Sequence, residues 1–192
     1  PACVMEERVR RAGDLGGYTR ALLDDAGIRG LVVDFGYPQP PLDKQWFRRV
    51  TGTRVVEVFR IEPLIKLLLE QCDDFASFQA RYRDSLAEAL AKPDCVGIKS
   101  IIAYRTGLAI VPTEEADARR SFAARSEGSL KPLRDWCLQV AMEMCLESDR
   151  VACIHTGAGD SEIRFDTARP ELLYDLLTSE PYRRVRTVLV HG

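Results

Sequence analysis

The sequence predicts an α/β protein in which parallel strands alternate with helices. Short runs rich in Val and Ile are separated by helix-like patterns along all 192 residues, as in consecutive βα units. Several of these runs are apolar without strict alternation, which is typical of strands covered on both faces. With 46% hydrophobic and 29% charged residues, the composition is that of a globular protein with a substantial core. We therefore expect a single domain over residues 1–192.

Five strands are expected, each a run of mainly β-branched and other apolar residues. They cover residues 28–34, 54–61, 95–102, 151–155 and 186–191. Helices are expected between them, because apolar residues recur there at helical spacing. These helices cover residues 18–26, 42–51, 75 to about 93, 113 to about 125, 132–144 and 171–177.

Residues that favour helix ends support these bounds. Gly27 and Gly52 each follow a helical pattern, and glycine readily adopts the left-handed conformation that ends a helix. Asp74 is suited to cap the helix that follows it. Pro132 suits the first turn of the next long helix, because the amide hydrogen that it lacks is not needed there.

Parallel βα units form either an open sheet or a closed barrel. No Gly-x-Gly-x-x-Gly motif follows the first expected strand, so a dinucleotide-binding sheet is not supported and the barrel is favoured. A complete (β/α)8 barrel needs eight strands and typically about 250 residues. We therefore expect a partial TIM-type (β/α)8 barrel that lacks strands at both its N- and C-terminal ends.

Charge and cysteine content limit the partners and the compartment. A formal net charge of -2 provides no field to attract nucleic acid or an anionic membrane, so a small-molecule substrate is expected. The longest apolar runs, such as Leu31–Val33, are far too short to span a bilayer. The six cysteines include no C-x-x-C pair, which favours buried free thiols in a cytoplasmic protein.

The only two histidines, His155 and His191, both fall at the C-terminal ends of expected strands. In a (β/α)8 barrel this end is the active-site face. A neutral imidazole fixed at a strand end suits a metal ligand or a general base. The structural alternative is a pair of buried histidines that are hydrogen-bonded to nearby backbone.

Lys99 is unusual because its ammonium group lies within an apolar strand, where it is costly to desolvate. Three interpretations remain open. Lys99 could be carboxylated and bridge two metal ions, it could form a Schiff base with a carbonyl substrate, or it could pair with a core carboxylate.

Further charged residues at strand ends are candidates for substrate binding. Arg60 and Arg105 could each bind a substrate carboxylate through the planar fork of the guanidinium group, although each could equally form a structural ion pair. Glu62 follows a strand and Asp160 lies in a glycine-rich turn after His155; both could bind polar groups of a substrate. No Gly-x-Ser-x-Gly motif supports a serine hydrolase.

Three segments carry a resemblance to a known family, namely residues 97–108, 154–160 and 189–192. They resemble the amidohydrolase superfamily, and more narrowly the amidohydrolase-related branch that in some fungi and plants is fused to a glutamine synthetase-like domain. Residues 25–34 and 58–62 fit the same branch. The resemblance implies that His155 is a metal ligand and that His191 is a ligand or a catalytic base. It places the family's carboxylated lysine at Lys99, which would then be both ligand and catalytic residue.

The resemblance also implies a reaction. A divalent metal, zinc by preference and one or two ions, would activate water to cleave the C–N bond of a small, carboxylate-bearing amide. The family's first-strand His-x-His pair and its eighth-strand Asp have no counterpart in this sequence, so we expect weak metal binding and little turnover. The resemblance implies a fusion to a glutamine synthetase-like domain, whereas the exposed strand edges of a partial barrel, at residues 28–34 and 186–191, favour pairing into a homo-oligomer. A decarboxylase of the same superfamily, a noncatalytic barrel for ligand sensing or assembly, and a Schiff-base lyase are the alternatives.

Overall fold

The computed structural model describes residues 2–36 and 40–191. Contacts between residues divide the chain into two compact units, Pro1–Glu57 and Val58–Gly192. The prediction of a single domain stays a prediction. No helix in the described ranges is long and apolar enough to cross a membrane.

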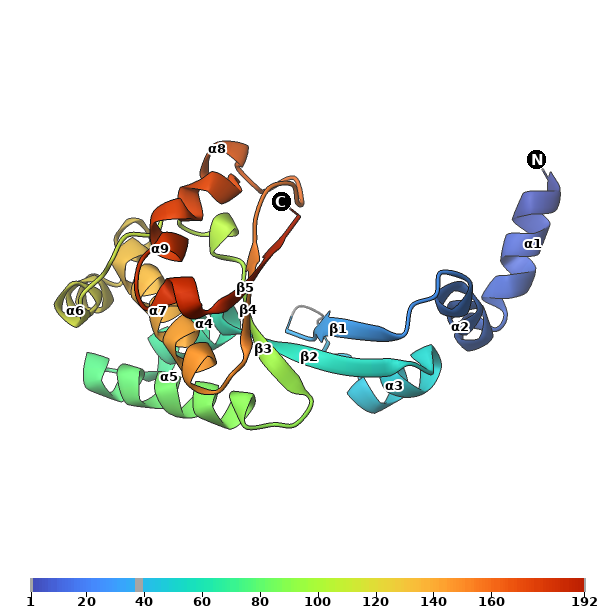
Figure 1. Cartoon of the computed structure of the whole chain (residues 1–192), viewed down its shortest axis with the longest axis horizontal. Helices are drawn as coiled ribbons and strands as arrows, with labels where there is room; N and C mark the ends of the chain where they lie inside the picture. The colour runs from blue at the N-terminus through green and yellow to red at the C-terminus, as the bar shows by residue number, and fades with distance from the viewer. Residues whose placement is uncertain (1, 37–39, 192) are drawn as a thin grey trace. The chain divides into compact units, whose positions relative to one another are not determined.

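The N-terminal unit consists of three helices, one strand and the start of a second strand (Figure 1). These are α1 (Ala2–Ala12), α2 (Leu15–Asp25), β1 (Gly30–Asp34), α3 (Lys44–Thr51) and the beginning of β2 (Arg54–Arg60). Asp43 caps α3 by accepting from the Gln45 and Trp46 amides, and Gly52 ends it with φ of 62°. Neither α1 nor α2 contains a buried residue.

The C-terminal unit contains the end of β2 and the remaining elements. In chain order these are α4 (Ile61–Gln71), α5 (Phe75–Leu90), β3 (Cys95–Ser100), η1 (Ile102–Tyr104), α6 (Glu115–Ala124), η2 (Glu127–Ser129), α7 (Lys131–Glu147), β4 (Val151–His155), α8 (Phe165–Ala168), η3 (Pro170–Leu173), α9 (Tyr174–Thr178), η4 (Tyr182–Arg184) and β5 (Arg186–Val190). An α/β fold with strands that alternate with helices is therefore confirmed.

Strands are neighbours in the sheet in the same order as in the chain, β1-β2-β3-β4-β5. β4 pairs in parallel with both β3 and β5, with Lys99 opposite Cys153 and His155 opposite Val190. Gly97 lies opposite Val151, and a Cβ atom at Gly97 would come within 1.9 Å of the Val151 carbonyl oxygen. The close approach of β3 to β4 at this point therefore requires glycine.

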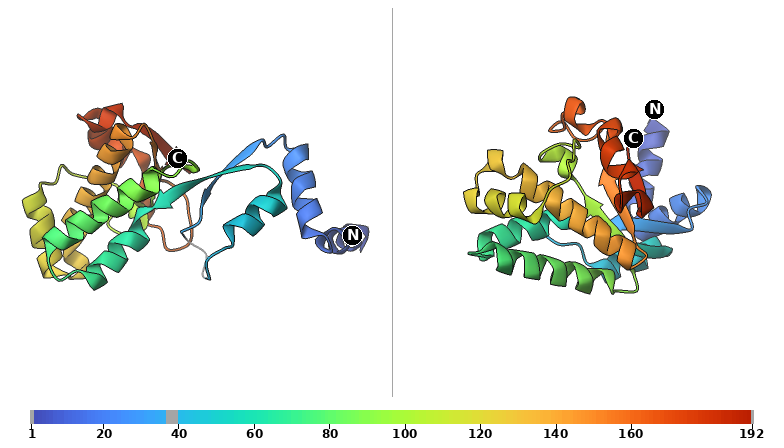
Figure 2. Two further views of the ribbon diagram at one scale, coloured as in Figure 1. Left: turned by 90° about the horizontal axis from the view of Figure 1, so that it is seen from below. Right: turned by 60° about the vertical axis from the view of Figure 1, so that its left-hand side comes forward.

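The hydrophobic core of this unit lies between the strands and the helices α4, α5 and α7 (Figure 1). Figure 2 shows α5 and α7 side by side, and their contact is filled by packed aromatic rings. Phe75, Phe78 and Tyr82 belong to α5 and Trp136 to α7, while Phe122 is contributed by α6. On the strands, Ile98, Ala152 and Ile154 point into this core.

All five expected strands are present, with small differences at their ends. The strand expected over 95–102 stops at Ser100, because Glu62 accepts hydrogen bonds from the Ser100 hydroxyl and the Ile101 amide. Helices α1 and α4 were not expected from the sequence. Five cysteines are buried free thiols as expected, whereas Cys3 is exposed.

Candidate functional site

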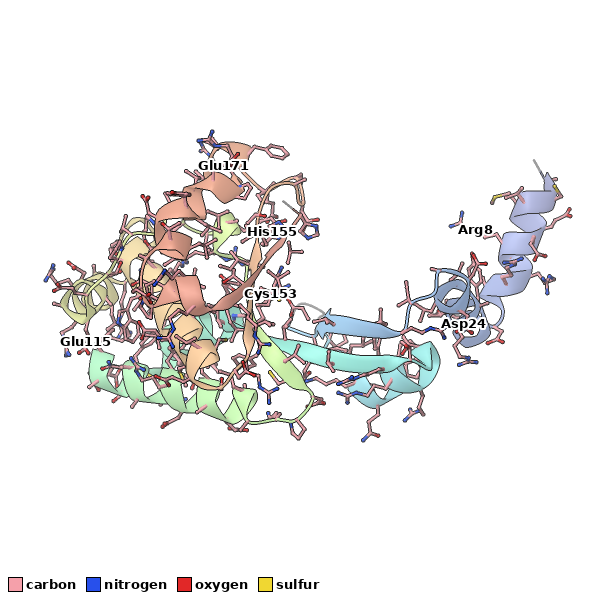
Figure 3. All side chains as sticks on the ribbon, viewed as in Figure 1. Arg8, Asp24, Glu115, Cys153, His155 and Glu171 are labelled. Carbon is pink, nitrogen blue, oxygen red and sulfur yellow. The ribbon has the colours of Figure 1, made fainter. Side chains whose placement is uncertain are left out.

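His155 ends β4 with a buried side chain that is only 6% exposed. Side chains alternate between the two faces of a strand, so Cys153 and His155 share one face while Ala152 and Ile154 enter the core on the other (Figure 3). The Nε2 atom of His155 is buried and has no hydrogen-bond partner among the described residues. A buried polar atom without a partner is costly, and it calls for a ligand or a functional explanation.

The second histidine lies beside the first. His191 follows directly after β5 in a left-handed conformation with φ of 69°, and its ring centroid is 4.7 Å from that of His155. Parallel pairing of β4 with β5 explains this proximity, because it brings the C-terminal ends of both strands to one edge of the sheet. The structure thus brings together the two histidines that the sequence placed at strand ends.

Lys99 points to the same face as His155. It pairs with Cys153 across β3 and β4, and it is only 8% exposed. Its ammonium group is close enough to affect His155 electrostatically, since it lowers the pKa of that imidazole. Lys99, His155 and His191 therefore form one group in the structure.

The ionisation of His155 reflects this setting. Burial lowers its pKa to about 4, and the positive charge of Lys99 and the ring of His191 add to the shift. A hydrogen bond with the Ala158 backbone and the nearby carboxylate of Asp160 oppose it. His155 is consequently a neutral imidazole at pH 7, which is the form that binds metals or accepts protons.

Tyr104 completes the surroundings of His155. Its ring centroid is 4.7 Å from that of His155, and its hydroxyl oxygen accepts a hydrogen bond from the Asp160 amide at 3.0 Å. Gly159 fits between them, since a Cβ atom there would lie 2.0 Å from the Tyr104 hydroxyl and 2.8 Å from His155 Nε2. Tyr104 is not among the site residues that the sequence predicts, because its contact is with Asp160, 56 residues further along the chain.

Glu62 lies on the other face of the sheet. It accepts hydrogen bonds from the Ser100 hydroxyl (2.7 Å) and the Ile101 amide (2.8 Å), and Ser100 points away from the face that carries Lys99. Burial raises the pKa of Glu62 in spite of these bonds. These contacts fix the end of β3, while substrate binding by Glu62 stays a prediction.

The two candidate arginines occupy different environments. Arg60 ends β2 and is half-buried, and its charge acts on Glu62 by lowering the pKa of that carboxyl group. Arg105 is exposed and follows Tyr104 at the end of η1. Asp160 is exposed as well, and its amide holds Tyr104. Arg105 is therefore next to Tyr104 in the sequence, and Asp160 contacts Tyr104 through a hydrogen bond. Arg60 instead acts electrostatically on Glu62.

The group fits part of a metal site. The unpartnered Nε2 of His155 and the adjacent His191 ring supply imidazole nitrogen, a preferred zinc ligand. Catalytic zinc sites, however, have three protein ligands and a water molecule. Within residues 2–36 and 40–191, no group of three or more His, Cys, Asp or Glu side chains could hold a metal ion. The two histidines would thus need Lys99, in carboxylated form, or ligands from other protein segments.

Comparisons with known proteins give two similarities, and no protein-family model matches the chain. The sequence is 29% identical over 180 residues to Protein fluG of Emericella nidulans, which covers 77% of this chain and 21% of fluG. The structure resembles a crystal structure from Lactobacillus casei ATCC 334, described as a "putative metal-dependent hydrolase", with a TM-score of 0.81 and 25% identity. That match covers 91% of this chain and 48% of the other. The chain therefore spans about half of the solved structure and about a fifth of fluG.

Proposed function

We propose that this chain carries part of the active site of a metal-dependent hydrolase, with His155 and His191 as metal ligands. The observation that carries the proposal is the pair of imidazoles at the ends of adjacent parallel strands, with His155 Nε2 buried and unpartnered. Similarity to a solved structure described as a metal-dependent hydrolase supports it. We further propose that the strands belong to a (β/α)8 barrel, which the parallel pairing of β3, β4 and β5 in chain order supports.

A divalent metal, zinc in our proposal, would supply Lewis-acid activation of water for attack on an amide carbonyl carbon. His155 suits the ligand role because it is neutral at pH 7 and fixed by burial. Lys99 would be a further ligand in carboxylated form, since its side chain shares the face of His155. His191, which is exposed, is proposed as a ligand or as a proton acceptor.

The proposed substrate is a small amide that bears a carboxylate group. Arg105 is exposed beside Tyr104, and its guanidinium group could bind the carboxylate in a bidentate manner. Asp160, whose amide donates to the Tyr104 hydroxyl, is a further proposed contact. Arg60 and Glu62 stay proposed contacts that have no described link to the two histidines. A cytoplasmic location is proposed from the cysteine content of the sequence, and a fusion to a glutamine synthetase-like domain is proposed from the sequence resemblance.

Product analysis tests the reaction class. The chain is loaded with Zn2+ and incubated with γ-glutamyl amides, and released amine is measured together with carbon dioxide. We expect slow, zinc-dependent amine release that is at least tenfold lower in His155→Asn, because an imidazole ligand is lost. The matched control is Arg164→Ala, whose exposed side chain pairs with the exposed Asp166.

Release of carbon dioxide without amine would contradict amide hydrolysis and would support the decarboxylase alternative. Equal amine release by the wild type and His155→Asn would contradict the proposal. A noncatalytic role in ligand sensing or assembly is the second candidate, and the observation in its favour is the lack of a third His, Cys, Asp or Glu ligand in the described part of the chain. This noncatalytic role predicts that added zinc produces neither amine release nor carbon dioxide release.

A further inference from the structure

The Nε2 atom of His155 is covered by the turn that follows β4. This atom is buried, and a Cβ atom at Gly159 would lie 2.8 Å from it and 2.0 Å from the Tyr104 hydroxyl oxygen. Both distances are shorter than ordinary van der Waals contact, so the Gly159 backbone lies directly over the imidazole. The rings of Tyr104 and His191 flank that imidazole, each with its centroid 4.7 Å away. A metal ion or a water molecule therefore cannot reach Nε2 in this conformation.

The turn over residues 157–160 has the features of a segment that can open. Ala158, Gly159 and Asp160 are exposed, and Gly157 adopts a left-handed conformation with φ of 65°. The Gly157 amide donates to the Ala168 carbonyl at 2.7 Å, which fixes the start of the turn to α8. Exposed segments with few buried contacts open most readily, and small residues at their ends can absorb the change in backbone angles.

A hydrogen bond to Tyr104 ties the other end of the turn to a different segment. The Asp160 amide donates to the Tyr104 hydroxyl at 3.0 Å. Tyr104 lies in η1, where its own amide donates to the Ile101 carbonyl at 2.9 Å and the Arg105 amide donates to the Ile102 carbonyl at 2.8 Å. The hydroxyl group is therefore supplied by a segment that is held independently of the turn.

We propose that residues 157–160 form a lid over His155 Nε2 and that the Tyr104 hydroxyl holds this lid closed. Opening of the lid exposes Nε2 to a divalent cation, so closing of the lid and metal binding compete. The use of Nε2 as a metal ligand rests on the proposed function, whereas the covering of Nε2 does not. The lid can close only because position 159 has no side chain.

Chemical modification of the metal-free full chain tests the lid. Diethyl pyrocarbonate acylates accessible, neutral imidazole, and mass spectrometry of peptides gives initial rates for the two histidines of the chain. In the wild type we expect the exposed His191 to react at least tenfold faster than His155. In Tyr104→Phe, which keeps the ring but removes the acceptor, His155 should react faster than in the wild type. The expected increase is about 2- to 10-fold, the factor that one hydrogen bond contributes to an equilibrium.

Gly159→Ala is a second variant, which also serves if Tyr104→Phe fails to fold. It should raise the rate at His155 at least as much, because the added methyl group does not fit the closed turn. Its matched control is Gly128→Ala, where a Cβ atom would have no neighbour within 4 Å. The control for Tyr104→Phe is Tyr174→Phe, which removes an exposed hydroxyl group. Both controls should keep the wild-type rate.

Two outcomes of the modification experiment would overturn the proposal. One is a wild-type chain in which His155 reacts as fast as His191, since Nε2 would then be open. The other is a wild-type rate at His155 in a folded Tyr104→Phe or Gly159→Ala chain.

Hydrogen exchange separates opening of the lid from a general loss of structure. In Tyr104→Phe the Asp160 amide should exchange faster than in the wild type, because it loses its acceptor, while the amides of α7 should keep their wild-type rates. Faster exchange throughout α7 would attribute the reactivity of His155 to unfolding and would overturn the role of Tyr104.

Zinc affinity connects the lid to the proposed function. When a ligand binds only the open state, the apparent dissociation constant is the intrinsic one divided by the open fraction. Tyr104→Phe should therefore bind zinc about 2- to 10-fold more tightly than the wild type. Equal or weaker binding by a folded Tyr104→Phe chain would overturn the competition between lid and metal. If no chain binds zinc, the proposed function fails, while modification of His155 still decides whether residues 157–160 cover it.

Discussion

At the residue scale, Gly97 shows how one position can decide whether two strands pair. Substitution by alanine would place a Cβ atom 1.9 Å from the Val151 carbonyl oxygen, so β3 and β4 would have to move apart. We expect Gly97→Ala to lower the free energy of unfolding by about 2 kcal/mol or more, as for overpacked cores. Urea unfolding measures this.

Gly128→Ala is the matched control, because a Cβ atom there would have no neighbour within 4 Å. It should leave the unfolding midpoint nearly unchanged. A Gly97→Ala midpoint equal to that of Gly128→Ala would show that the strands do not approach as closely as described.

The low pKa of His155 predicts a pH dependence of stability. Its pKa is about 4 in the folded chain and about 6.5 when unfolded, so between these values the unfolded state binds the additional proton. This contribution to stability is present above pH 6.5 and is lost as the pH falls toward 4. Urea unfolding at pH 7 and pH 4.5 should therefore show a larger loss for the wild type than for His155→Gln. Equal losses would contradict the folded-state pKa.

At the scale of elements, Arg125 connects the end of α6 to the junction of α4 and α5. Its guanidinium group donates to the Leu69 carbonyl (3.2 Å), the Cys72 carbonyl (2.7 Å) and the Asp73 carbonyl (3.0 Å), and it lies 4.4 Å from the centre of the Phe122 ring. Carbonyls at a helix C-terminus have no partner within the helix, so a cation there is stabilising.

We expect Arg125→Ala to lower the free energy of unfolding by about 1–3 kcal/mol, the range for hydrogen bonds to charged groups. Chemical denaturation followed by circular dichroism measures the change. Arg120→Ala, which removes only an exposed ion pair with Asp117, should cost less than about 0.5 kcal/mol. A smaller effect at Arg125 than at Arg120 would rule out this connecting role.

Much of the element order could be predicted from the sequence, for particular reasons. β-branched runs such as residues 151–155 identify strands, and Gly52 marks the end of α3. Helix α4 was not predicted; Pro63 lies in its first turn, where proline is tolerated because its missing amide hydrogen is not needed. The charged segment of α1 gave no periodic apolar signal, and none of its residues is buried.

The candidate site could be predicted only in part. Histidines that end parallel strands meet at one edge of the sheet, so His155 and His191 were identified together. Tyr104 accepts a hydrogen bond from the amide of Asp160, 56 residues further along the chain, and no local pattern shows that contact. Glu62 was grouped with the site because it follows a strand, and only its bond to Ser100 shows that it lies on the other face.

At the scale of the whole molecule, burial differs strongly between segments. Helices α1 and α2 contain no buried residue, whereas α7 contains ten. Since local opening is easiest where few apolar contacts are buried, amides of α1 and α2 should exchange with deuterium much faster than those of α5 and α7. Hydrogen exchange with mass spectrometry measures this in the intact chain. Equal protection in α1 and α7 would contradict the described burial.

The most direct test of the central claim is equilibrium binding of Zn2+ to the purified chain at pH 7, by competition with a chromophoric chelator. We predict weak, stoichiometric binding that is reduced at least tenfold in both His155→Asn and His191→Asn and is unchanged in Tyr174→Phe. Zinc binding as strong as that of the wild type in either histidine variant, or no binding by the wild type, would contradict the assignment of His155 and His191 as metal ligands.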